Sequence, residues 1–238
     1  MAARELRAAV TGLAAFAATQ EQVLLAAVPP SEEGSPARWA ALPVVAHNTE
    51  FRRQQLVRLR AIRSGQAPPE FSEADHQSAA LYAELSAQPA DAVARDSWRV
   101  TGELMDELAL VSAADLTDPS RQPWLRGRQL WLQVIVRGFW HPAGHLGEYY
   151  GSHGQADRAV ALARQGVATA DLLAAPDPAR GMASYNLACA LAGAGLLDEA
   201  AAAVAEAIEL NPDLRVNAAR DADLAAVRTS ERLTALLT

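Results

Sequence analysis

The chain has 238 residues, of which 50% are hydrophobic and 21% are charged, a composition typical of a globular protein with one large or two small domains. Its net charge of −7 excludes the basic face that neutralises phosphates, so we expect no nucleic-acid partner. All 21 basic residues are arginines, which excludes Schiff-base and P-loop lysine chemistry, and the single cysteine, Cys189, excludes an internal disulfide and a cysteine-rich zinc site.

A first amphipathic helix is predicted over residues 2–27. Apolar side chains recur there at steps of three and four, and Glu5, Gln20, Glu21 and Gln22 fall on other faces of the helix. The residues expected to pack in the domain are Leu6, Val10, Leu13, Phe16, Val23 and Leu24. No run is long and apolar enough to span a membrane, and we expect a cytoplasmic protein without a membrane partner.

Three further helical segments follow, separated by loops rich in proline and glycine. The second runs from about Ala37, or from just before Pro43, to Ser64; the third covers 72–113 as one helix or as two broken near Pro89; the fourth covers about 124–150. The apolar residues of the third segment that are expected to pack in the bundle are Ala79, Leu81, Leu85, Val93, Trp98, Leu104, Leu108 and Val111. Strand signals are nearly absent, so an all-α fold with an up-down four-helix bundle is predicted.

The residues best suited to chemistry lie in the fourth segment, in the stretch from Trp140 to Tyr150. His141 and His145 are four residues apart, which places both imidazoles on one face of a helix, and Glu148 continues that face. A third histidine, His47, lies in the second segment among apolar residues and is expected to face the bundle interior. His76 and His153 are expected to be solvated.

One histidine early in the second helix and two histidines four apart in the fourth resemble the pattern of the DinB-like family of four-helix bundles. In that family three imidazoles usually bind a divalent metal, so the resemblance implies that His47, His141 and His145 are ligands of a metal such as zinc or nickel. Three protein ligands and an open position are typical of a catalytic zinc site. Glu148 and Glu50 are weak candidates for an acid–base or supporting role.

Pro142 departs from a regular helix between the two histidines. A proline inside a helix loses one hydrogen bond and clashes with the carbonyl four residues back, here that of Gly138. Either the helix kinks between Gly138 and Pro142 and both histidines still face inward, or a new helix begins with Pro142 in its first turn and His141 as its cap. Without metal, the three histidines would be hydrogen-bonded to one another or to neighbours within the bundle.

The end of the fourth segment also resembles the start of a tetratricopeptide (TPR) repeat. Leu146-Gly147, Tyr150, Gly154 and Ala159 follow the spacing of a first repeat, and the second repeat contains Leu187, Leu191, Gly195, Ala200, Val204, Ala207 and Pro212. We therefore predict a DinB-like bundle over 1–152 and TPR-like hairpins with capping helices over 153–238, with the last bundle helix shared between them. Cys189 is then expected to be a buried core residue.

The family resemblance implies a metal-dependent enzyme that acts on a small electrophilic substrate by thiol-dependent transfer or by hydrolysis. The thiol would be of low molecular weight, such as mycothiol. Two alternatives stay open: a non-catalytic interaction module that binds a protein or peptide through the TPR-like region, and a resistance protein that sequesters a small molecule. The sequence also allows a homodimer.

Overall fold

The computed structural model describes residues 1–29, 31–71 and 79–228, and within these ranges it contains helices and no β-strand. The all-α prediction is therefore confirmed. The chain divides into two compact units, residues 1–145 and 146–238, and the division falls inside one helix. In the described ranges no helix has both the length and the apolar character needed to cross a membrane. His76 lies outside the described residues.

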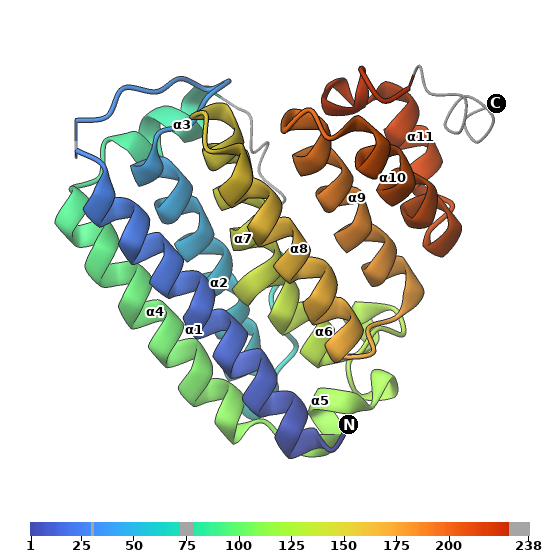
Figure 1. The fold of residues 1–238 in the computed structure, drawn as a ribbon. Coiled ribbons are helices and arrows are strands. Elements are labelled where there is room, and N and C mark those ends of the chain that lie inside the picture. Colours follow the sequence, from blue (N-terminus) through green and yellow to red (C-terminus); the bar gives the residue numbers. More distant parts are fainter. Residues whose placement is uncertain (30, 72–78, 229–238) are drawn as a thin grey trace. The chain divides into compact units, whose positions relative to one another are not determined.

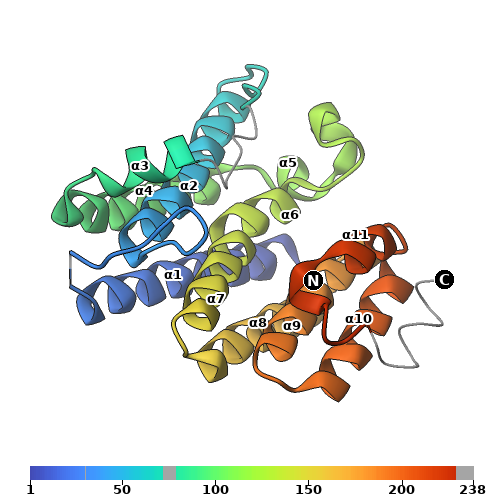
Figure 2. The ribbon, with the colours of Figure 1, turned by 90° about the horizontal axis from the view of Figure 1, so that it is seen from above.

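Unit 1 is a bundle of helices in which α4 packs against α1 and α2, while the fourth helical segment packs against the same two helices (Figures 1 and 2). That fourth segment is a continuous run of α6, the π-helical turn η3 and α7. The elements of the unit are α1 (Ala3–Ala27), α2 (Ala41–Arg63), α3 (Ala79–Ser86), α4 (Ala90–Leu110), α5 (Ala113–Thr117), the 3-10 turns η1 (Pro119–Arg121) and η2 (Pro123–Leu125), α6 (Leu130–Ile135), η3 (Val136–Trp140) and α7 (His141–Ser152).

Prolines and caps decide two boundaries that the sequence left open. α2 begins at Ala41, just before Pro43, and the carboxylate of Glu32 accepts the Ala41 backbone N–H at 2.7 Å. The N–H groups of a first helical turn have no partner within the helix, so this carboxylate stabilises the start of α2. Pro89 is the residue before α4, which makes α3 and α4 separate helices.

The interior of unit 1 contains a charged pair that the helical pattern did not predict. Glu21, expected on a polar face of the first helix, is fully buried, and Arg52 of α2 donates to its two carboxylate oxygens at 2.8 and 2.6 Å. Asn48 and Ser97 donate to the same carboxylate at 3.0 and 2.8 Å. The carboxylate of α1 accepts hydrogen bonds from α2 and α4, which allows the charge to be buried.

Some of the apolar residues that were predicted to pack inside the bundle are exposed. Leu6, Val10 and Leu24 of α1 are buried as expected, whereas Phe16 and Val23 are exposed. Trp98 of α4 is 57% exposed, because α4 turns its neighbour Ser97 inward to the Glu21 carboxylate. The inward face of α4 thus carries Ser97 together with the buried Val93, Val100 and Leu104.

Unit 2 is a series of antiparallel helices in which α9 packs on both α8 and α10 (Figure 1). After the last residues of α7 it contains α8 (Ala156–Leu172), α9 (Asp177–Gly193), α10 (Leu197–Leu210), α11 (Leu214–Arg220) and the 3-10 turn η4 (Ala222–Leu224). Gly195, in the turn between α9 and α10, has a φ of +76°, a conformation that residues with a side chain rarely adopt. Ala200, Val204 and Ala207 of α10 are fully buried in this unit.

Candidate metal centre

Three histidines meet inside unit 1, and they are the three that the sequence singled out. His47 lies on α2 and is only 3% exposed, while His141 and His145 lie one turn apart at the start of α7 and are half-buried. One ring nitrogen from each imidazole lies within 4.8 Å of the others. Among the described residues this is the one group of three or more potential metal ligands that comes so close together.

One pair of ring nitrogens has a spacing that fits both the ligation of a shared metal ion and a direct hydrogen bond between the two rings. Nε2 of His141 lies 3.2 Å from Nε2 of His47. With zinc–nitrogen bonds of 2.0–2.1 Å and tetrahedral angles, two ligand nitrogens are about 3.3 Å apart. The rings are also steeply inclined: His145 is edge-on to His47 and to His141, with interplanar angles of 84° and 85°. Three neutral imidazoles converging from two helices are a suitable donor set for zinc, nickel or iron.

The helix continues through Pro142, as in the first of the two predicted routes, but with a π-helical turn where a kink was expected. η3 is a π-helical turn, in which the His141 N–H bonds to the carbonyl of Val136 five residues back. The wider turn accommodates the proline without breaking the helix, because the hydrogen bonds no longer follow the four-residue pattern that Pro142 would disrupt. His141 is itself helical, with φ −64° and ψ −49°, so His141 and His145 are a true helical pair.

An aromatic residue that the sequence placed near His47, without giving it a role, contacts two of the three imidazoles. The Phe51 ring stacks on His141 with a centroid distance of 4.0 Å and an angle of 16°, and it tilts against His47 at 4.7 Å. The Arg137 guanidinium lies 4.3 Å from the Phe51 ring centroid. In the sequence, Phe51 follows His47 by four residues and Arg137 precedes His141 by four residues. This spacing places the two members of each pair on one helix face, and it is the signal that could have identified the contact.

The two glutamates proposed as supporting groups have other neighbours. Glu50 is half-exposed on α2 and accepts a hydrogen bond from Arg53 at 3.0 Å. Glu148 is exposed and belongs to unit 2. Its negative charge acts there on Asp223, whose pKa is raised by burial and by the charges of Asp221 and Glu148. Neither belongs to the cluster of potential ligands, and their catalytic role stays a prediction.

The remaining histidine and the cysteine are not part of this site. His153 is half-buried, rather than solvated as expected, because its ring stacks on Tyr149 with a centroid distance of 4.0 Å. Cys189 is partly buried in unit 2, and burial together with the nearby Asp221 carboxylate raises the pKa of its thiol. A raised pKa disfavours the thiolate, so Cys189 is a poor nucleophile.

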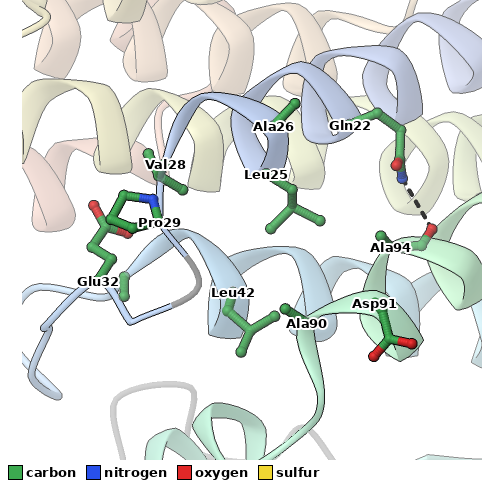
Figure 3. A pocket seen from close by; sticks show the side chains of 11 residues that line it. Gln22, Leu25, Ala26, Val28, Pro29, Glu32, Leu42, Ala90, Asp91 and Ala94 are labelled. Atoms are coloured by element: carbon green, nitrogen blue, oxygen red, sulfur yellow. Dashed lines mark hydrogen bonds between the residues drawn. The ribbon is translucent and has the colours of Figure 1, made fainter.

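A separate cavity of about 300 Å³ lies where the C-terminal end of α1 meets the N-terminal ends of α2 and α4 (Figure 3). Leu25 and Leu42 face it from α1 and α2, and Gln22 bonds to the Ala94 carbonyl at its edge. None of the three histidines is among its lining residues. The imidazole cluster therefore remains the best site for chemistry in unit 1.

The chain matches no family model, no curated protein and no solved structure. The case for a function rests on the residues and their geometry.

Proposed function

We propose that the protein is a divalent-metal-dependent enzyme of the DinB-like class, with His47, His141 and His145 as the metal ligands. The observation that carries the proposal is the convergence of one nitrogen from each imidazole within 4.8 Å. Its support is chemical: three histidines, with no fourth potential ligand grouped with them among the described residues, would leave room for a water or a substrate on the ion, as in catalytic zinc sites. Zinc and nickel are the ions that we favour.

A bound divalent ion would supply Lewis-acid chemistry, since it lowers the pKa of a water or thiol that it binds. The residues of the chain have a different task, which is to hold the three imidazole nitrogens in place around the ion. The burial of His47 and the packing of the Phe51 ring suit that task. We propose transfer of a low-molecular-weight thiol to a small electrophile, or hydrolysis of that electrophile, as the reaction.

Metal analysis of the purified full-length chain tests the site. We expect about one equivalent of zinc or nickel per chain after loading and dialysis, because the donor set is that of a single-ion site. His145→Ala should lose the metal while its circular dichroism stays helical. His153→Ala is the matched control, because this imidazole stacks on Tyr149 outside the cluster and its loss should leave the metal content unchanged. A chain that binds no metal under any loading condition would refute the proposal.

A screen of electrophiles with and without thiols separates an enzyme from a sequestering protein. The enzyme proposal expects turnover that depends on the metal and is absent from His145→Ala. Stoichiometric binding of the electrophile without turnover would instead favour the sequestering function, which would use the same cluster.

For unit 2 we propose TPR-like hairpins. The support is the α9–α10 hairpin, in which the small residues Ala200 and Ala207 are buried and Gly195 makes the turn. Small residues at such positions let two helices approach closely. A protein or peptide partner that binds this unit remains the second candidate function.

A further inference from the structure

Two side chains of the fourth helical segment enclose the ring of Phe51, which comes from α2. Arg137 on η3 places its guanidinium carbon 4.3 Å from the ring centroid, and the His141 imidazole stacks at 4.0 Å. Two planar groups cannot both lie about 4 Å above the same face of one ring, so they cover opposite faces. Phe51 is thus held between a guanidinium and an imidazole from one helical segment.

The stacked Phe51 ring restricts the rotation of the His141 imidazole. The imidazole and the phenyl ring are 16° from parallel, so a rotation of the imidazole about its Cβ–Cγ bond would drive its edge into the phenyl face. Phe51 cannot withdraw, because its own side chain is buried and Arg137 covers its other face. The same ring also contacts His47, at a centroid distance of 4.7 Å.

We propose that Phe51 is a positioning residue for the metal centre. Held by Arg137, it fixes the plane of the His141 imidazole and so the direction in which Nε2 presents its lone pair to the ion. The inference rests on the proposed metal-binding function. Groups that orient a ligating histidine without touching the metal commonly change metal affinity by about 10- to 100-fold when they are replaced.

Cobalt(II) loading of the full-length Phe51→Leu variant is the direct test, since the visible absorption of cobalt reports the geometry of its ligands. We expect cobalt to bind about 10- to 100-fold more weakly, measured by competition with a chromophoric chelator, and with an altered absorption spectrum. Phe51→Tyr keeps the ring and should retain both the affinity and the spectrum. A purely structural role for Phe51 would not change the spectrum of the bound ion.

Phe16→Leu is the matched control, because it removes a phenyl ring that pairs with Phe139 and not with a histidine. It should bind cobalt as the unaltered protein does. Arg137→Met gives a second variant that leaves Phe51 in place, and it should shift the spectrum in the same direction with a smaller loss of affinity. Unchanged affinity and spectrum in folded Phe51→Leu would overturn this inference alone, whereas failure of the unaltered protein to bind any metal would overturn the proposed function and this inference together.

Discussion

Glu21, Arg52, Asn48 and Ser97 form a polar group in the interior of unit 1, away from water. The Arg52–Glu21 pair is bidentate and neither side chain is exposed. Taking two charges out of water is costly, and the pair is tolerated only because each charge neutralises the other and the carboxylate has further donors. Removing one partner should therefore be much more harmful than removing both.

Replacing Arg52 by methionine tests this at the scale of one residue. Arg52→Met leaves the Glu21 carboxylate buried without its counter-charge, and we expect the free energy of unfolding in urea to fall by about 3–5 kcal/mol. The double variant Glu21→Gln/Arg52→Met should recover much of that loss, since the uncharged amide oxygen can still accept from Asn48 and the amide NH2 can donate to the Ser97 hydroxyl oxygen.

Arg53→Met, the same substitution at the next position, is the control. Arg53 is more than a third exposed and pairs with Glu50 and Asp96 at the surface, so its loss should cost at most about 1 kcal/mol. Equal losses for Arg52→Met and Arg53→Met would contradict the energetic role assigned to the buried pair.

The π-helical turn η3 packs closely on α1. A Cβ atom added to Gly138 in this turn would lie 3.3 Å from the Cβ of Ala14. Such a contact is tight for two carbon atoms, so a larger residue can be accepted only if η3 or α1 moves. Gly138 therefore allows the close approach that brings the start of α7 beside α2.

Gly138→Ala tests whether the close packing of η3 on α1 limits the size of residue 138. Overpacking commonly costs about 1–3 kcal/mol, which exceeds the gain of up to about 1 kcal/mol from replacing glycine by alanine in a helix. We therefore expect a net decrease in the free energy of unfolding. Gly102→Ala in the middle of α4 has nothing within 4 Å of the added atom and should instead stabilise the chain. If Gly138→Ala is the more stable of the two, the close approach is not limiting.

The helices themselves could largely be predicted from the sequence, because apolar periodicity and proline or glycine breaks are local signals. α1 was predicted over 2–27 and runs over Ala3–Ala27. The inward-facing position of His47 was likewise expected from the helical pattern, whereas its convergence with the α7 pair was implied by the resemblance to the DinB-like family. The burial of Glu21 was not predictable, because it depends on long-range hydrogen bonds from Arg52 and Ser97 on two other helices, and neither was the π-turn, which no local pattern around Pro142 specified.

At the scale of the whole molecule, α7 belongs to both units. His141 and His145 lie in unit 1, whereas the buried Leu146 and Tyr150 of the same helix lie in unit 2. No loop separates the two groups. Helices propagate cooperatively once formed, so we expect the loss of structure in one unit to destabilise the helix on which the other depends.

The tryptophans provide a measurement of this coupling. All five, at positions 39, 98, 124, 131 and 140, lie in unit 1, so their fluorescence reports that unit alone. Far-ultraviolet circular dichroism reports the helices of both units. We expect the two signals to follow the same thermal transition, and a circular dichroism transition that continues after the fluorescence change is complete would show that the units unfold independently.

The π-turn also couples the number of residues between 136 and 140 to the type of residue at position 142. A π-turn holds one residue more than the α-helical turn that it replaces. A homologue that lacked one residue between 136 and 140 could form a regular α-helix there and still present both imidazoles from the same face. In that regular helix, a proline at 142 would clash with the carbonyl four residues back. In an alignment of relatives, a gap between 136 and 140 should therefore occur together with loss of the proline, and a chain that has the gap but keeps the proline would contradict this account.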